Sequence, residues 1–171
     1  MDVLWSPWRS KYIDTFKGED KNGNVSCFLC DAAQSDEKSD KELLIITRRS
    51  NCFALLNKFP YNNGHVLIAP CRHVGDMEEL TDDELSGLMF LIRDTIKALN
   101  EAYSPHGYNA GINLGRTAGA GVPGHLHFHV VPRWNGDTSF MAVLSDVKVV
   151  SQSLEDTRDI LSGIFNRLNK K

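Results

Sequence analysis

The amino-acid sequence predicts an α+β fold in which an antiparallel sheet packs against one central helix. Three observations support this prediction: five short apolar segments, a long amphipathic segment between the third and the fourth of them, and a second amphipathic segment near the end of the chain. Apolar segments joined by short connections favour antiparallel strand pairs. With 171 residues, the chain is long enough for one domain with a sizeable core.

Five segments are predicted to form β-strands, the first three because of their length and their Leu, Ile and Val content. They are LLIIT (43–47), CFALLN (52–57), HVLIAP (65–70), NAGINLG (109–115) and HLHFHVVP (125–132). The FPYNNG segment between the second and the third contains Pro, Asn and Gly, which favour a tight turn. Residues 1–40 have no such pattern, so we expect an irregular arm there, with Trp5 and Trp8 as its apolar anchors.

Two segments have the spacing of amphipathic helices. In residues 81–104 apolar side chains recur every three or four positions, and Thr81 followed by Glu84 forms a capping-box pattern. Residues 153–168 repeat the spacing, with Asp156 in the first turn. We expect the first helix to cover one sheet face, which leaves the other face for a site. The apolar positions are Leu85, Leu88, Met89, Ile92, Ile96 and Leu99 in the first helix, and Leu154, Ile160, Leu161, Ile164, Phe165 and Leu168 in the second.

The net charge and the apolar runs of the sequence argue against two classes of partner. A formal charge of −3 and a pI near 6.0 do not favour the basic face that binds long nucleic acid. No apolar run approaches the length of a membrane span, and the N-terminal residues lack the apolar segment of a signal peptide. We therefore expect a cytoplasmic protein with no nucleic-acid or membrane partner. A small phosphorylated ligand held by backbone donors remains compatible with this composition.

Three of the six histidines lie at alternate positions in GHLHFHVVPRW: His125, His127 and His129. Alternate side chains of a strand point the same way, so these imidazoles share one face while the apolar residues between them face the core. Three interpretations compete. The histidines are exposed and have no role, they form one three-histidine metal site, or they divide the work among a metal ligand, a nucleophile and an orienting group.

The CFLC segment favours the third interpretation. Cys27 and Cys30 have the C-x-x-C spacing of half a zinc site, and no second C-x-x-C follows in the chain. His73 and His125 are available to complete a closed structural site of two cysteines and two histidines. The alternative for the two cysteines is a pair of reduced, buried thiols. We expect structural zinc and no organic cofactor.

The segment NLGRTAGAGVPG, immediately before the histidines, is rich in Gly and Ala. Successive backbone N–H groups in such a loop can form an anion-binding nest, although a flexible surface loop has the same composition. A neutral histidine with a fixed tautomer can attack phosphorus when donors hold the phosphoryl oxygens. The neighbouring histidines therefore favour a phosphate-binding loop.

Several motifs resemble those of the histidine-triad (HIT) family. HLHFHVV resembles the triad signature, and NKFPYNNGHVLIAPCRHV resembles the upstream block of the same family. LWSPWR and PRWNGDTSF are similar to the branch of fragile-histidine-triad-type dinucleoside polyphosphate hydrolases and bacterial diadenosine tetraphosphate phosphorylases. The resemblance runs over nearly the whole chain. It implies a HIT-like fold: a five-stranded antiparallel sheet with a central and a C-terminal helix, continued across the two-fold axis of a homodimer.

The resemblance also implies roles for individual histidines. His127 would be the nucleophile that forms a covalent nucleotidyl intermediate. His129 would support the phosphate or the tautomer of its neighbour, and His65 would join the same hydrogen-bond relay. The zinc ligands implied by the family are Cys27, Cys30, His73 and His125.

The implied substrate-binding residues come from three segments. Asn57 would contact the nucleotide, Asn113 would lie near the phosphates, and the loop would contribute Gly119 and Gly121. Trp134 follows the triad strand and can reach a nucleobase or the partner subunit, although a packing role is the simpler interpretation. Many members of the family carry Gln or Ser shortly before the triad, whereas this chain has AGAGVPG there. Stabilisation of the transition state would then depend more on backbone donors.

The expected function is cleavage of a dinucleoside polyphosphate, with adenine nucleotides as substrates, at the α-phosphorus by water or by phosphate. Two alternatives remain open: a nucleoside 5'-phosphoramidate hydrolase, and a nucleotide-binding interaction protein with little turnover. We expect one domain over 1–171, divided into an arm (1–40) that carries the C-x-x-C pair, a catalytic core (41–135) and a C-terminal extension with a helix (136–171).

Overall fold

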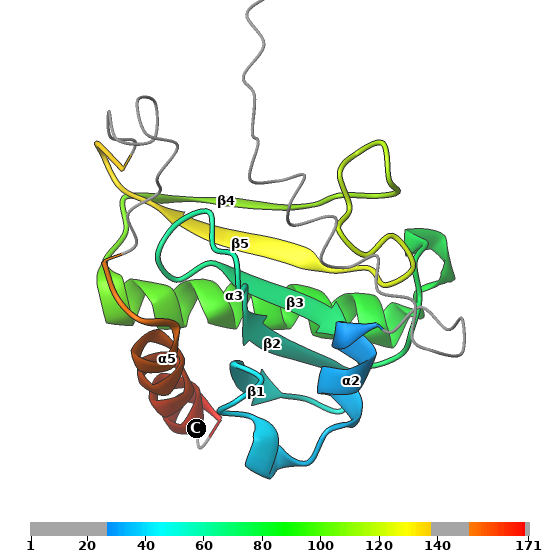
Figure 1. Ribbon diagram of the computed structural model, residues 1–171, viewed down its shortest axis with the longest axis horizontal. Helices are drawn as coiled ribbons and strands as arrows, with labels where there is room; N and C mark the ends of the chain where they lie inside the picture. The colour runs from blue at the N-terminus through cyan, green and yellow to red at the C-terminus, as the bar shows by residue number, and fades with distance from the viewer. Residues whose placement is uncertain (1–26, 138–150, 170–171) are drawn as a thin grey trace, which may run out of the picture.

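The structure, a computed structural model, describes residues 27–137 and 151–169, which form a five-stranded sheet with helices on both faces (Figure 1). Its strands follow the order β1-β2-β3-β5-β4, and every neighbouring pair is antiparallel. This confirms the predicted sheet. The elements in chain order are α2 (Phe28–Gln34), the 3-10 helix η1 (Glu37–Ser39), β1 (Ile45–Arg48), β2 (Cys52–Leu56), β3 (Val66–Pro70), the 3-10 helix η2 (Met77–Glu79), α3 (Asp82–Tyr103), β4 (Gly107–Ile112), β5 (Phe128–Arg133) and α5 (Leu154–Leu168).

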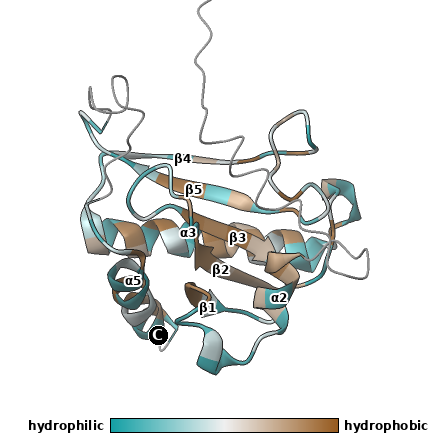
Figure 2. Ribbon diagram, viewed as in Figure 1, coloured by the Kyte–Doolittle hydropathy of each residue, from teal (hydrophilic) through white to brown (hydrophobic). Residues whose placement is uncertain are grey.

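The larger core lies between the sheet and the helices α3 and α5, and Figure 1 shows α3 crossing behind the strands. Every residue of β2 and β3 is buried, because both faces of these central strands are covered. This burial accounts for their continuous apolar sequences, which Figure 2 shows as uninterrupted hydrophobic ribbons. Among the described helices, none is long and apolar enough to cross a membrane.

The helix α2 covers part of the opposite sheet face, where Leu29 and Ala32 pack with Phe53, Leu55 and Leu67. The expectation of irregular structure up to residue 40 is therefore wrong for Phe28–Gln34. A seven-residue helix has too few turns for a periodic signal, and packing stabilises it rather than propensity. Residues 1–26 of the arm, with Trp5 and Trp8, lie outside the described residues, as do the last three residues of PRWNGDTSF.

The predicted helix starts are confirmed. The Thr81 hydroxyl accepts from the Glu84 N–H at 3.2 Å, and the Glu84 carboxylate accepts from the Thr81 N–H at 2.9 Å, which completes the capping box. The expected apolar stripes are wrong at one position in each helix. Met89 is 51% exposed and Ile160 is 41% exposed, because each lies at the edge of the face that contacts the sheet. In α3, Leu91 is buried in the core instead.

The strand boundaries differ from the prediction at the histidines. Regular pairing of β5 begins at Phe128, so His125 and His127 precede the strand. The reason is that β3 ends at Pro70, and the Leu126 N–H donates to the Val74 carbonyl at 2.7 Å instead. Strand β4 runs from Gly107 to Ile112, two to three residues before the predicted 109–115. The apolar residues between the histidines still pack into the α3 core, as predicted.

Gly64, at the end of the turn before β3, has a φ of +71°. A Cβ atom there would lie 3.0 Å from Leu99 Cδ2. We expect Gly64→Ala to lower the free energy of unfolding by about 1–3 kcal/mol. This corresponds to a melting temperature lower by about 3–10 °C in thermal denaturation.

The control is Gly163→Ala in the interior of α5, where an added Cβ meets no atom within 4 Å. Alanine favours a helix over glycine by up to about 1 kcal/mol, so this variant should melt at the same or a higher temperature. Equal destabilisation of both variants would contradict a specific need for glycine at position 64.

Candidate active site

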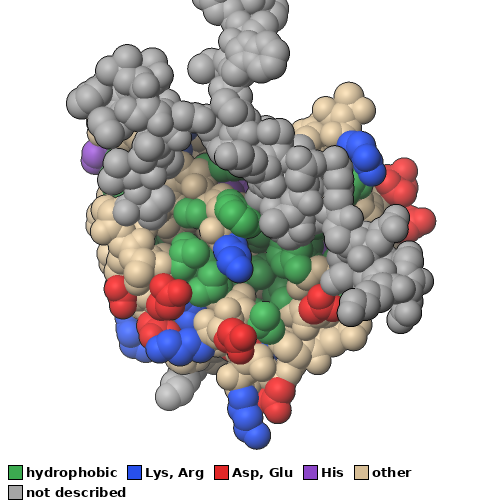
Figure 3. Space-filling view, viewed as in Figure 1, with side chains coloured by type: hydrophobic (Ala, Val, Ile, Leu, Met, Phe, Trp, Pro, Cys, Tyr) green, Lys and Arg blue, Asp and Glu red, His purple; other side chains and the backbone are tan. Residues whose placement is uncertain are grey.

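The sheet face opposite α3 carries the candidate active site. Figure 3 views this face, where hydrophobic side chains gather over β2 and β3 and charged side chains lie along the lower rim. His129 pairs with Leu67 across β5 and β3. Its ring centroid lies 5.2 Å from that of His65 and 5.1 Å from that of His127. The structure thus brings together the three histidines that we predicted to be catalytic.

Backbone groups fix the tautomers of these rings. The Tyr61 N–H donates to His65 Nδ1 at 3.1 Å, so the proton of a neutral His65 lies on Nε2. His65 Nε2 then donates to His129 Nδ1 at 3.0 Å, which leaves the proton of a neutral His129 on Nε2. The His127 ring donates from Nδ1 to the His125 carbonyl oxygen at 2.8 Å. The lone pair of His127 therefore lies on Nε2.

Burial favours the neutral form of His65 and of His127. The side chain of His127 is only 5% exposed, and burial lowers its pKa, opposed by the hydrogen bond to the His125 carbonyl. For His65, burial, with further contributions from His129 and His127, lowers the pKa to about 3. A neutral His127 with its lone pair on Nε2 and its other nitrogen held by a carbonyl has the form that a nucleophile toward phosphorus needs.

Two asparagines organise the segments around the histidines. Asn57, at the end of β2, is buried; its side-chain oxygen accepts from the Phe59 N–H at 2.9 Å, and its nitrogen lies 3.4 Å from His65 Nδ1. Asn113, after β4, donates to the Gly119 carbonyl at 3.4 Å and ties the Gly-rich loop to the sheet. Both asparagines therefore shape the backbone next to the histidines.

The other two predicted substrate-binding residues lie further apart. Gly121 is half-buried in the loop that leads to the triad. Trp134 follows the end of β5, where its backbone N–H donates to the Asp137 carboxylate at 3.2 Å. It is half-buried at the end of the strand away from His127.

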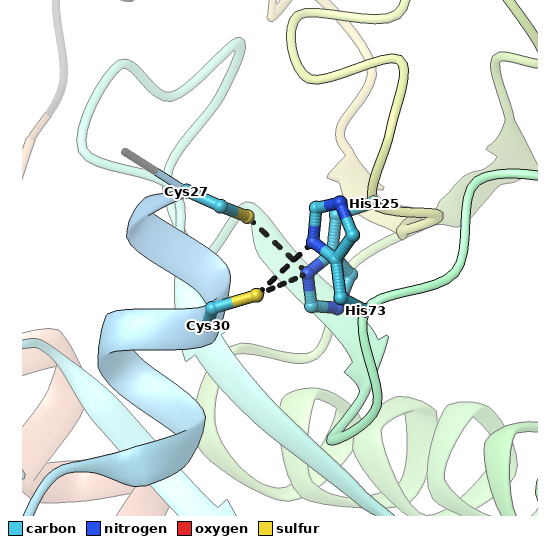
Figure 4. Close-up of side chains that lie close together, drawn as sticks. All are labelled: Cys27, Cys30, His73 and His125. Atoms are coloured by element: carbon cyan, nitrogen blue, oxygen red, sulfur yellow. Dashed lines mark hydrogen bonds between the residues drawn. The ribbon is translucent and has the colours of Figure 1, made fainter. Parts of the chain in front are cut away.

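A second cluster joins Cys27 and Cys30 to His73 and His125, and its donor atoms all lie within 4.8 Å of one another. Figure 4 shows the two thiols at the start of α2 facing the two imidazoles. Cys27 Sγ lies 3.3 Å from His125 Nδ1, and Cys30 Sγ lies 3.1 Å from His73 Nδ1. These residues are the four that the sequence predicted as metal ligands.

The chemistry of this cluster fits a zinc ion. The His125 ring donates from Nε2 to the Pro70 carbonyl at 2.9 Å, so the lone pair on Nδ1 points toward the thiols. Burial, followed by the neighbouring Cys27, raises the pKa of Cys30 to about 11. A divalent cation would supply the positive charge that thiolates need here. Two sulfurs and two nitrogens at these separations match a closed tetrahedral zinc site, which has no open position for substrate.

The sequence patterns did not indicate that Tyr61 belongs to the site. Its ring centroid lies 4.7 Å from that of His65 and 6.0 Å from that of His129, and its N–H sets the His65 tautomer. The available signal was its place in the turn just before His65. An aromatic residue in a turn has many possible roles, and its contact with the triad depends on how the turn folds back.

Comparison with known proteins places the chain in a family. The HIT domain model matches residues 38–136. Over 165 residues the chain is 39% identical to an AP-4-A phosphorylase of Mycobacterium tuberculosis, covering 96% of this chain and 84% of that protein. It is 31% identical over 111 residues to an adenosine 5'-monophosphoramidase of Schizosaccharomyces pombe, covering 65% and 77%. The fold is similar to a zinc-bound histidine triad family protein of Mycobacterium smegmatis, with a TM-score of 0.66, 24% identity, and coverage of 85% and 96%. The chain belongs to the HIT domain family.

Proposed function

We propose that this protein is an enzyme that cleaves dinucleoside polyphosphates at the α-phosphorus through a nucleotidyl-His127 intermediate. The main supporting observation is the neutral, buried His127, whose Nδ1 donates to the His125 carbonyl and whose Nε2 keeps its lone pair. The 39% identity to an AP-4-A phosphorylase supports the choice of an adenine nucleotide as substrate.

In the first step, the lone pair of His127 Nε2 attacks the α-phosphorus, and the bond from that phosphorus to the bridging oxygen breaks. The second nucleotide leaves with the electron pair as a phosphate anion, so it needs no proton from the protein. The N–H of His129 Nε2 donates to a phosphoryl oxygen and stabilises the charge that develops there. While phosphorus is bound to Nε2, the His127 ring is cationic, and the His125 carbonyl stabilises it through Nδ1–H.

In the second step, water or inorganic phosphate attacks the same phosphorus, and the bond from phosphorus to Nε2 breaks with its electrons returning to the ring. An attacking water releases one proton to the solvent, whereas a phosphate oxygen anion attacks without losing one, and both regenerate the neutral His127. Water gives a nucleoside monophosphate, and phosphate gives a nucleoside diphosphate. In this proposal, Asn57 contacts the first nucleotide, and Asn113, Gly119 and Gly121 lie near the phosphates. The Gly-rich loop offers backbone donors where many family members carry Gln or Ser. Trp134 either contacts a nucleobase or has only a packing role within the protein.

The Cys27, Cys30, His73 and His125 cluster is proposed to hold zinc. Bound there, the ion would supply the charge that keeps both thiols ionised and would join α2 to the segment before the triad. The four protein donors leave no position for substrate, which supports a structural role. His125 belongs to both sites, since its ring is a proposed ligand and its carbonyl holds His127.

We further propose a cytoplasmic homodimer, organised as one domain, in which the sheet continues from β4 of one protomer to β4 of its partner. Within the described residues, β4 is an edge strand paired with β5 alone, and its central positions are exposed. An unpaired edge is a template for strand addition. The molar mass by light scattering tests this arrangement, and a monomer at micromolar concentration would contradict it.

The test of the proposed reaction is a product assay on diadenosine tetraphosphate, with and without inorganic phosphate. AMP and ATP identify water as the acceptor, whereas ADP and ATP identify phosphate. Adenosine 5'-phosphoramidate is assayed in parallel, because one relative is a monophosphoramidase. Cleavage of the phosphoramidate without cleavage of the tetraphosphate would contradict the proposal in favour of that second activity.

The pH profile should show that the pKa of His127 lies below that of an ordinary histidine. Protonation of Nε2 removes the attacking lone pair, so kcat/KM falls as the pH drops through the pKa of His127. Burial lowers that pKa below its ordinary value of 6.5, so the midpoint of the acid limb should lie below pH 6.5. Initial rates at limiting substrate from pH 4 to pH 8 give the midpoint. A midpoint at or above 6.5 would contradict a buried, neutral nucleophile.

A further inference from the structure

A cavity of about 260 Å³ lies over β4 and β5, next to the histidines. Asn109 of β4 and Val131 of β5 are paired in register and form part of its floor. Val131 lies two residues after His129, so both side chains point to the same sheet face. The other lining residues are Tyr61, Asn62 and Arg133.

A hydrogen-bond network makes one wall of the cavity polar and rigid. The Arg133 guanidinium donates to the two oxygens of Asp137 at 2.6 and 2.9 Å, and to the Asn109 side-chain oxygen at 2.7 Å. Asn62, which is buried, donates to Asp137 at 2.9 Å and to the Pro132 carbonyl at 3.0 Å. Asp137 neutralises Arg133, so this wall does not suit a bare phosphate group. It presents N–H donors of Arg133 and Asn109 at fixed positions instead.

The opposite wall is aromatic and apolar. The ring of Tyr61 is nearly parallel to that of His129, with 14° between the planes, and the residue is 45% exposed. Together with Val131, the Tyr61 ring offers a flat surface beside the polar wall. A nucleobase has the matching chemistry, because its ring stacks on aromatic side chains and its edge accepts hydrogen bonds. The volume is also below the roughly 300–1,000 Å³ of sites for drug-sized ligands, so it suits one nucleoside.

The position of the cavity relates it to the leaving group. Val131 lies about 7 Å along β5 from His129, and the His129 ring lies 5.1 Å from that of His127. Asn57, the proposed contact of the first nucleotide, directly follows β2, which lies on the other side of His65 and His129 in the sheet order. The length of about 7 Å from His129 to Val131 exceeds that of a single phosphate or an amine, so a leaving group with several phosphates is needed to carry a nucleoside from His127 to the cavity.

We infer that this cavity binds the nucleoside of the leaving nucleotide, with its base stacked on Tyr61 and its polar edge facing Asn109 and Arg133. The inference rests on the proposed function and deepens it, because it explains selection of substrates that carry a second nucleoside. The enzyme then prefers diadenosine tetraphosphate to adenosine 5'-tetraphosphate, which has the same first nucleoside and phosphate chain.

The experiment compares kcat/KM of the full chain on those two substrates for the wild type, Asn109→Ala and Tyr61→Leu. Stacking of a base on an aromatic side chain contributes about 1–3 kcal/mol, so Tyr61→Leu should lower kcat/KM on diadenosine tetraphosphate by about 5- to 100-fold relative to adenosine tetraphosphate. Asn109 lies outside the histidine cluster. Asn109→Ala should lower kcat/KM on diadenosine tetraphosphate, relative to adenosine tetraphosphate, by about 3- to 10-fold. The matched control is Asn135→Ala, an exposed asparagine outside the cavity lining, which should leave both values unchanged.

The outcomes separate this inference from the proposed function. Wild-type protein that cleaves both substrates equally well overturns the inference and leaves the proposed function standing. The inference is also overturned if Tyr61→Leu and Asn109→Ala lower kcat/KM on both substrates by the same factor, or lower it on neither. Wild-type protein that cleaves neither substrate overturns the proposed function and the inference together.

Discussion

Replacement of His127 by alanine should lower turnover of diadenosine tetraphosphate by a factor on the order of 10⁴. In the proposed mechanism the variant loses the nitrogen that forms the covalent intermediate, while His65, His129 and the Gly-rich loop remain to hold phosphate. Nucleotide affinity should therefore change little. Single-turnover rates measure the first effect, and isothermal titration with a non-hydrolysable dinucleotide measures the second.

The control is His106→Ala. His106 is exposed after the end of α3, and its ring accepts a hydrogen bond from the Asn135 N–H. This substitution also removes an imidazole, yet it should leave turnover unchanged. An active His127→Ala enzyme, or equal losses in both variants, would refute the assignment of His127 as nucleophile.

Substitution of Cys27 by serine should remove the bound zinc and lower the melting temperature by more than about 10 °C. Within the described residues, α2 contacts the sheet through few apolar side chains, chiefly Leu29 and Ala32. A helix of seven residues is not stable alone. The metal bonds would therefore join α2 to the segment after β3, which carries His73, and to the segment before β5, which carries His125. Elemental analysis of the purified protein and calorimetry measure both effects.

The matched control is Cys71→Ala, because Cys71 is partly buried against the same small core and lies outside the four-residue cluster. This variant should keep about one zinc ion per chain and most of its stability. Full zinc content in Cys27→Ser, or absence of zinc from the wild type purified without chelator, would contradict the proposed metal site.

The metal cluster and the nucleophile meet at one residue. His125 places its ring among the thiols and its carbonyl oxygen 2.8 Å from His127 Nδ1. Gly124 lies against the ring of His73, where a Cβ atom would be 3.3 Å from Nε2. Loss of the metal would therefore disturb the tautomer of His127 as well as the end of the Gly-rich loop.

Much of the fold followed from local sequence patterns. Strands β2 and β3 were predictable because burial on both faces makes them continuously apolar, and α3 because its capping box is complete within four residues. Helix α2 was not predicted, since its stability depends on contacts with Phe53 and Leu67, which are far away in the chain. The same limit applies to Met89, whose exposure depends on how α3 is rotated against the sheet.

The site was predictable in its residues but not in its proton positions. Alternation placed His125, His127 and His129 on one face, and C-x-x-C spacing with two unclaimed histidines pointed to the metal cluster. The tautomers depend on the Tyr61 N–H and on a carbonyl of the triad itself, and no sequence pattern encodes these contacts. The network of Arg133 and Asp137 likewise forms only when the end of β5 folds back.

The proposed mechanism requires a covalent bond between His127 and the α-phosphorus. Wild-type protein is mixed with diadenosine tetraphosphate, quenched within the first turnover at alkaline pH, digested and mapped by tandem mass spectrometry. We expect an adenylyl group on His127, in the peptide that contains residues 125–129, and no such group in His127→Ala. An adenylyl group on another residue, or products formed in a wild-type first turnover that leaves His127 unmodified at every quench time, would contradict it.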